Sequence, residues 1–136
     1  MAMELDLSPL ERSVAALEQA VAEFAAEPQR RVVRAGLIQY FEFTYEVCHK
    51  TLKRFLESNL SSETDLDHLR FPDLIRTGNE QGLLRDEWPQ WELYREMRNE
   101  SSHAYAEEVA LKVLSGIPRF LAEAQYLRDQ LQRRCR

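Results

Sequence analysis

The chain has 136 residues, which fits one domain with a sizeable hydrophobic core. Four glycines, five prolines and long runs rich in Leu, Ala, Glu, Arg and Gln favour an all-α protein over a sheet protein or a disordered chain. The formal net charge of -5 argues against a domain that holds duplex nucleic acid by charge alone, because such binding needs clustered cations.

Cysteine usage and hydropathy bear on the compartment. Cys48 and Cys135 lie far apart, which suggests neither a disulfide framework nor a metal knuckle and fits a reducing compartment. The first residues carry no secretory signal pattern, and no apolar run reaches the length that spans a bilayer. We therefore expect a cytoplasmic protein without a membrane span. Local basic patches remain possible at Arg30, Arg31 and Arg34, and at Arg128, Arg133, Arg134 and Arg136.

The first helix is predicted to begin at "SPLE". Ser8 suits the N-cap, Pro9 the first helical position, and Glu11 would complete a capping box. An apolar stripe continues to about Ala26, and Pro28 ends it. The stripe consists of Leu10, Val14, Leu17, Val21 and Phe24.

A second, longer helix is predicted from about Gln29 to Leu60, with more than half of its surface buried. The polar stretch "SNLSSETDLDH" that follows is rich in residues that favour turns. The apolar face consists of Val33, Leu37, Phe41, Thr44 or Tyr45, Cys48, Leu52 and Phe55, widened by Ile38 and Tyr40.

A short helix should start near Pro72 and stop at Gly78, and another helix should run from about Glu87 to Arg98. Trp88 and Trp91 on that second piece are expected to be core or interface anchors.

The last helix is predicted to extend to Arg134, with a bend where Gly116 and Pro118 interrupt it. Together these elements predict a single domain, residues 1–136, built as an antiparallel four-helix bundle with an additional short helix.

The stretch "RNESSHAY", residues 98–105, is poor in apolar anchors. Asn99, Ser101 and Ser102 are unfavourable inside helices and favourable at their ends, so one helix should end near Asn99 and the next begin between Ser102 and Tyr105. On one unbroken helix Arg98 and His103 would point to different sides, whereas a break lets both turn into one groove.

Arg98 and His103 suit phosphodiester chemistry without a metal. An imidazole can take a proton from a ribose 2′-hydroxyl or give one to the leaving oxygen, and a guanidinium can stabilise charge on the phosphate. Tyr105 adds a hydroxyl that could orient a ligand or accept a transferred group. An ordinary arrangement of helix caps and salt bridges fits the same residues. We predict neither a cofactor nor a metal site, since no residue cluster has metal-ligand spacing. Of the other histidines, His49 should pack beside the apolar face and His68 should be solvated.

The same stretch resembles the Arg-x4-His-x-Tyr motif of the HEPN superfamily, in particular its HepT-like members, which are also described as nucleotidyltransferase substrate-binding proteins. Residues 38–57, "IQYFEFTYEVCHKTLKRFLE", resemble the signature of the family's second helix, except that His49 replaces its usual Trp. Residues 74–99, "LIRTGNEQGLLRDEWPQWELYREMRN", resemble the family's glycine-containing turn, the Trp after it and the entry into the motif.

The resemblance implies a role for each motif residue. Arg98 and His103 match the catalytic pair of metal-independent HEPN ribonucleases, and Asn99 matches the polar residue that supports it. Tyr105 matches the tyrosine that a partner MntA-like minimal nucleotidyltransferase adenylylates to silence HepT-like toxins. The family also implies a homodimer whose two motifs line one groove, with RNA as the possible substrate.

Two functions therefore stay open. The first is a ribonuclease toxin of a toxin-antitoxin pair, neutralised by its partner nucleotidyltransferase. The second is a non-catalytic substrate-binding subunit of a two-component nucleotidyltransferase, in which Arg98, His103 and Tyr105 bind a nucleotide. The chain lacks the glycine-serine turn and paired aspartates that a nucleotidyltransferase needs, so it is not itself the transferase.

Overall fold

The structure is a computed structural model that describes residues 5–59 and 70–135. The described ranges contain helices and loops but no β-strand, as the sequence predicts. The elements are α1 (Ser8–Ala26), α2 (Arg31–Asn59), α3 (Phe71–Glu80), α4 (Trp88–Glu100), the 3-10 turn η2 (Ser101–His103) and α5 (Glu107–Arg134).

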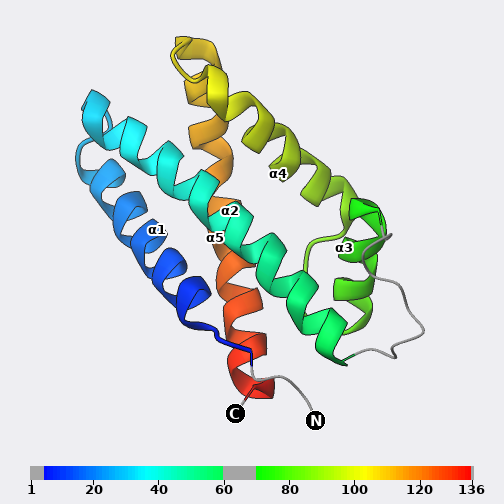
Figure 1. Cartoon of the computed structure of the whole chain (residues 1–136). Helices are drawn as coiled ribbons and strands as arrows, with labels where there is room; N and C mark the ends of the chain where they lie inside the picture. The colour runs from blue at the N-terminus through cyan, green and yellow to red at the C-terminus, as the bar shows by residue number, and fades with distance from the viewer. Residues whose placement is uncertain (1–4, 60–69, 136) are drawn as a thin grey trace.

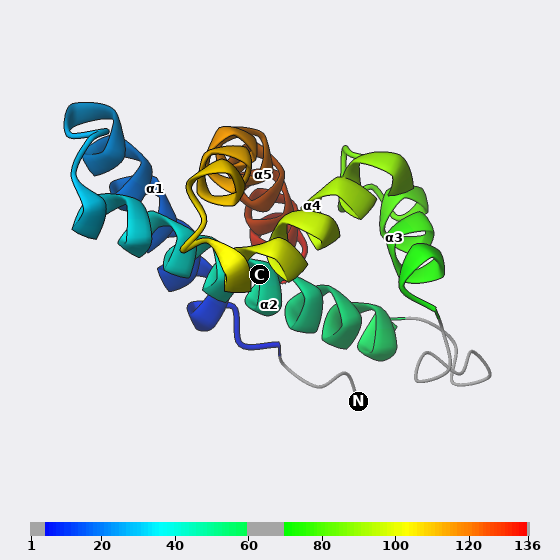
Figure 2. The same ribbon diagram turned by 90° about the horizontal axis from the view of Figure 1, so that it is seen from above.

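The four long helices form an antiparallel bundle (Figure 1). The α1–α2 turn and the junction between α4 and α5 lie at one end of it, at the top of Figure 1. The start of α1 and the end of α5 lie at the other end. Seen from above, α5 lies between α1 and α4, and α3 lies beside α4 on its outer side (Figure 2). The stretch 98–105 is therefore placed next to the N-terminal end of α2.

Helix α1 begins at Ser8 as predicted, but its cap differs from the prediction. Ser8 is the first helical residue, Leu7 takes the cap position, and no capping box forms. The Asp6 carboxylate accepts the Ser8 N–H at 2.9 Å, the amide that Glu11 would bind in a capping box. Glu11 turns instead toward α5, where it accepts a hydrogen bond from Gln132 at 2.6 Å.

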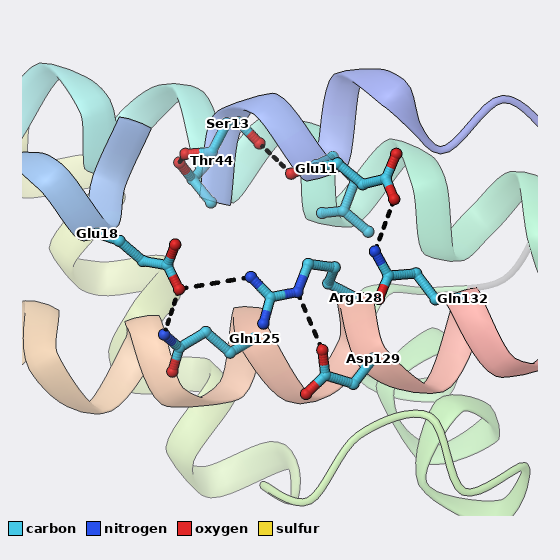
Figure 3. A network of polar contacts seen from close by, with 9 residues as sticks. Glu11, Ser13, Glu18, Thr44, Gln125, Arg128, Asp129 and Gln132 are labelled. Atoms are coloured by element: carbon cyan, nitrogen blue, oxygen red, sulfur yellow. Dashed lines mark hydrogen bonds and ion pairs between the residues drawn. The ribbon is translucent and has the colours of Figure 1, made fainter. Parts of the chain in front are cut away.

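A row of polar contacts joins α1 to α5 (Figure 3). Glu18 accepts hydrogen bonds from Gln125 at 2.7 Å and from Arg128 at 3.4 Å. Arg128 also pairs with Asp129 at 3.0 Å. Part of the predicted basic patch near the end of the chain is therefore neutralised within the fold.

Helix α2 spans Arg31–Asn59, against a predicted range of 29–60, and Leu60 with most of the polar connection lies outside the described residues. The predicted apolar face is buried for most of its length. Val33 is only partly buried and Tyr40 is 45% exposed, so the face is narrower than predicted near the start of the helix. The buried residues are Leu37, Ile38, Phe41, Thr44, Tyr45, Cys48, Thr51, Leu52, Phe55 and Leu56.

The predicted stop of α3 at Gly78 is wrong. Gly78 lies inside the helix, and the turn comes at Gly82, whose φ of 74° is the left-handed conformation that glycine adopts freely. Gly78 packs closely on Leu84, since an added Cβ would lie 2.9 Å from Leu84 Cδ1 and that side chain would have to shift.

Aromatic rings from α2, α4 and α5 fill the centre of the bundle. Phe41 meets Phe120 edge to face with 5.0 Å between ring centroids, and Trp91 meets Tyr94 at 5.2 Å. Trp91 is buried and Trp88 packs on Phe71, so the two tryptophans are core anchors as expected.

One fully buried carboxylate connects this core to the loop before α4. Glu123 of α5 accepts hydrogen bonds from the backbone N–H groups of Arg85 (3.0 Å) and Asp86 (2.9 Å), and from Trp91 Nε1 (2.9 Å). Burial raises the pKa of Glu123, while the three donors act in the opposite direction. Glu123 thereby fixes where α4 begins.

Helix α5 continues through Gly116 and Pro118 without an assigned break, and Glu107 and Glu108 lie in its first turn. Gly116 lets α5 approach α4 closely, because an added Cβ would fall 2.5 Å from Met97 Sδ. Met97 directly precedes Arg98, so this close contact lies beside the motif.

Candidate functional site

The site lies where α4 gives way to α5. Helix α4 reaches Glu100, one residue beyond the predicted end, and η2 carries the chain to His103 before α5 begins at Glu107. The serines explain the break, since Ser101 Oγ donates to the Arg98 carbonyl (2.7 Å) and Ser102 Oγ to the Asn99 carbonyl (3.1 Å). Helix α5 starts two residues after the latest predicted position, Tyr105.

Two carboxylates of α2 hold the guanidinium of Arg98. Arg98 Nε donates to Glu46 Oε1 at 3.1 Å, and Nη1 donates to Glu42 Oε2 at 3.3 Å. Glu42 Oε2 also lies 2.6 Å from Ser101 Oγ, whose single hydroxyl proton is shared between this carboxylate and the Arg98 carbonyl. The side chain of Arg98 is 32% exposed, and its Nη2 makes no hydrogen bond to the described residues. Arg98 is thus oriented within one chain, and its Nη2 remains without an acceptor in the described ranges.

His103 and Tyr105 lie together at the surface. Both are exposed, Tyr105 to 88%, and their ring centroids are 6.3 Å apart in an edge-to-face arrangement. Asn99 is also exposed. In the described part of the chain, no hydrogen bond joins Arg98 to His103. A single chain therefore brings His103 close to Tyr105, whereas the side chain of Arg98 on α4 is held against Glu42 and Glu46 of α2.

A cavity of about 610 Å³ opens beside this junction, between α2, η2 and the start of α5. Tyr105, Ser101 and Glu42 contribute to its lining, whereas Arg98 and His103 do not. The full lining is Arg31, Arg34, Ala35, Ile38, Gln39, Glu42, Ser101, Ala104, Tyr105, Glu107 and Ala110.

Sequence reasoning missed the acidic partners of this site. Glu42 and Glu46 bind Arg98, and Glu107 pairs with Arg34 at 2.8 Å between the starts of α5 and α2. The signal available was the pair of acids four residues apart in "YFEFTYEV", which share one edge of an otherwise apolar helix. What periodicity cannot show is which cation, 52 or 56 residues away, they face.

The remaining candidate residues have structural surroundings. His49 packs on Phe71 with 4.7 Å between ring centroids, as a packed side chain should, and burial lowers the pKa of this imidazole. Burial also raises the pKa of the Cys48 thiol, which keeps it protonated and unreactive. His68 lies outside the described residues.

Residues 5–59 and 70–135 contain neither a metal-binding cluster nor a membrane-spanning helix. No group of three or more His, Cys, Asp or Glu side chains is placed to hold a metal ion there. No helix in those ranges is long and apolar enough to cross a membrane.

Comparison with known proteins places the chain in a family. A family model described as "Nucleotidyltransferase substrate binding protein like" matches residues 5–133. A "Probable ribonuclease HepT" of Haemophilus influenzae is 35% identical over 142 residues, which cover 98% of this chain and 97% of that protein.

A solved structure from Haemophilus influenzae is also similar. It is described as the fold of a substrate binding domain of a nucleotidyltransferase, and it shares 34% identity with this chain. The two superpose with a TM-score of 0.86 over 93% of this chain and 99% of the other. Sequence and fold agree along nearly the whole length, and the chain therefore belongs to the HepT-like family of nucleotidyltransferase substrate-binding proteins.

Proposed function

We propose that this protein is a metal-independent ribonuclease, with Arg98 binding the scissile phosphate and His103 transferring protons. The observation that carries the proposal is the exposed imidazole of His103, five residues beyond a guanidinium that two carboxylates orient and whose Nη2 is open. The similarity to a probable ribonuclease along 98% of the chain supports the same activity.

The reaction would proceed by attack of the ribose 2′-hydroxyl. A neutral imidazole takes the hydroxyl proton, the 2′-oxygen bonds to phosphorus, and the bond from phosphorus to the 5′-oxygen breaks. An imidazolium protonates the departing 5′-oxygen, and Arg98 stabilises the additional negative charge on the phosphate. Asn99, at the exposed end of α4, would support the arginine.

We propose a homodimer as the working form, because one chain carries a single motif histidine and the reaction uses an acid and a base. Two chains related by a two-fold axis would supply both from two copies of His103. Light scattering should then give twice the 16.0 kDa of one chain. Dilution to monomer should lower the cleavage rate per chain, and a rate that does not change on dilution contradicts the dimer.

Tyr105 would be the site at which a partner MntA-like nucleotidyltransferase adenylylates and silences the enzyme, as in a toxin-antitoxin pair. Its exposed fraction of 88% leaves the hydroxyl accessible to a second protein. Incubation with the partner and ATP should add adenylyl mass to the wild type and to Tyr40→Phe, an exposed tyrosine of α2, but not to Tyr105→Phe. Modification of Tyr105→Phe would contradict the assignment.

Expression of the wild type beside His103→Ala tests the activity. The wild type should slow growth and cut purified RNA in the presence of a chelator, and His103→Ala should do neither while keeping its helical circular dichroism. A folded wild type that leaves RNA intact would disprove the ribonuclease.

One observation favours a second function, a non-catalytic substrate-binding subunit of a nucleotidyltransferase. Arg98 already pairs with Glu42 and Glu46, and the cavity is lined by Tyr105 rather than by Arg98 and His103. Under this function His103→Ala and the wild type would both be harmless, and the wild type would bind the transferase without cutting RNA.

A further inference from the structure

The cavity beside Tyr105 has a two-part lining that the catalytic proposal does not use. Its floor is apolar, since Ile38 and Ala110 are 7% and 6% exposed and Ala35 and Ala104 lie around them. Its outer wall carries two arginines from the first turn of α2, Arg31 and Arg34. The lining therefore combines a surface for a flat apolar group with cations for an anion.

The arginines are held differently. The side chain of Arg34 is only 16% exposed and its Nη2 lies 2.8 Å from Glu107 Oε1, so it is fixed in direction. Arg31 is exposed and pairs with no carboxylate in the part of the chain that the structure describes. Two guanidinium groups within one turn of helix can bind a single phosphate from two sides, because each presents a planar fork of donors.

The two acidic residues of the lining, Glu42 and Glu107, differ in how far they neutralise the positive charge of the arginines. Glu42 is occupied by Arg98 and by Ser101 Oγ. Glu107 is 67% exposed and, among the residues that the structure describes, is held only by Arg34, so an arriving phosphate can replace it at little cost. The Glu107 carboxylate occupies on Arg34 the place that a phosphate would take.

We propose that this cavity binds a nucleoside monophosphate, with Arg34 and Arg31 on the phosphate and the apolar floor under the nucleoside. A volume of about 610 Å³ is adequate for one nucleotide. The Gln39 side-chain amide, also in the lining, offers a donor and an acceptor to a base edge.

This nucleotide site would add a means of regulation to the proposed ribonuclease. It rests on the proposed function only in that adenylylation of Tyr105 would be the source of the nucleotide. Tyr105 contributes to the cavity lining, so an adenylyl group on its hydroxyl would be attached beside this cavity. A nucleotide bound there lies beside Glu42, the partner of Arg98, and replaces the Arg34–Glu107 pair that joins α2 to α5.

Calorimetric titration of the unmodified full chain with AMP, adenosine and inorganic phosphate tests the site. AMP should bind at least about tenfold more tightly than either fragment, because only AMP uses both parts of the lining. Arg34→Gln should weaken AMP binding about tenfold or more. Arg30→Gln, which removes the neighbouring arginine paired with Glu27 outside the cavity, should leave it unchanged.

Glu107→Gln should change the AMP affinity in the opposite direction, and it tests whether breaking the Arg34–Glu107 pair is by itself enough to weaken binding. This variant removes the competing carboxylate and should tighten AMP binding by about threefold to tenfold. No AMP binding by the wild type, equal affinity for phosphate and AMP, or equal weakening in Arg30→Gln would each overturn the site.

A separate titration with AMP, carried out on protein adenylylated at Tyr105, distinguishes a free nucleotide from the attached adenylyl group as the occupant of the cavity. Loss of AMP binding there shows that the attached group fills the cavity, and unchanged binding shows that the cavity serves free nucleotide only. Failure of the ribonuclease leaves the AMP titration unaffected, so the two proposals fail independently.

Discussion

Arg98 is oriented before any ligand arrives. Its Nε and Nη1 are used by Glu46 and Glu42, which come from one face of α2, and Nη2 is left without an acceptor among the described residues. The orientation of this arginine matters as well as its charge, because the planar guanidinium fixes the direction in which the remaining N–H donors point.

Arg98→Lys tests that claim. A lysine keeps the positive charge but cannot reach both carboxylates and a phosphate together, so the RNA cleavage rate should fall about 100-fold. The free energy of unfolding in urea should fall by only about 1 kcal/mol or less, because the ion pairs are partly exposed. Arg95→Lys, an exposed arginine three residues earlier on α4, should change neither quantity. Wild-type cleavage by Arg98→Lys would show that a point charge is sufficient.

His49 makes stability depend on pH. Burial lowers its pKa below the ordinary value of 6.5, so the unfolded chain binds a proton in a pH range where the folded chain does not. The contribution of His49 to stability is therefore present above pH 6.5 and is lost as the pH falls through the folded-state pKa.

In His49→Phe the ring against Phe71 is kept and the titration is removed. Urea unfolding at about pH 7.5 and about pH 5.5 should show a smaller loss of stability for His49→Phe than for the wild type. An equal loss in both proteins would mean that His49 is solvated in the folded state.

At the scale of elements, the contact between Glu123 and the loop before α4 positions the helix that carries Arg98. Both carboxylate oxygens accept hydrogen bonds, so an amide at this position would turn an NH₂ group toward a donor. Glu123→Gln should lower the free energy of unfolding by about 1–3 kcal/mol. Glu92→Gln, an exposed acid of α4, should stay within about 0.5 kcal/mol of the wild type. A Glu123→Gln protein as stable as the wild type would refute the role of the carboxylate.

Two glycines should respond with opposite signs to the same substitution. Gly82 has a φ of 74°, so Gly82→Ala should destabilise the protein by about 1 kcal/mol or more. Gly36 lies within α2, and a Cβ added there would meet no atom within 4 Å, so Gly36→Ala should stabilise it by about 0.5–1 kcal/mol. Thermal unfolding of both variants measures the two shifts, and a stabilised Gly82→Ala would contradict the assigned turn.

At the scale of the whole molecule, the sequence predicts the helices well because their apolar stripes are local. Leu10, Val14 and Leu17 repeat at helical spacing and are all fully buried. The all-α bundle follows from four such stripes.

The wrong predictions at the start of α1 and at the end of α3 arise where two nearby residues could each fill the same structural role. Ser8 is a good cap residue, but the Asp6 carboxylate takes the amide at the helix start. Gly78 resembles a helix stop, but Gly82 is the residue that turns, and Gly78 serves side-chain packing. Local propensity does not distinguish between two suitable residues four positions apart.

In the candidate site, too, one part could be predicted from the sequence and another could not. The break after α4 could be predicted, because Ser101 and Ser102 satisfy backbone carbonyls from their own side chains. The partners of Arg98 could not, because Glu42 and Glu46 meet it only after α2 and α4 pack together. Nor does spacing show that Tyr105, rather than Arg98, lines the cavity.

Proton transfer by His103 to and from RNA is the central step of the proposed ribonuclease. The decisive measurement is the chemistry of the ends produced when purified chain cleaves a defined RNA in the presence of a chelator. Attack by the 2′-hydroxyl should leave a 2′,3′-cyclic phosphate on one fragment and a 5′-hydroxyl on the other, and His103→Ala should produce neither. Fragments with 5′-phosphate ends, cleavage that stops with the chelator, or intact RNA after incubation with folded wild-type dimer would contradict it.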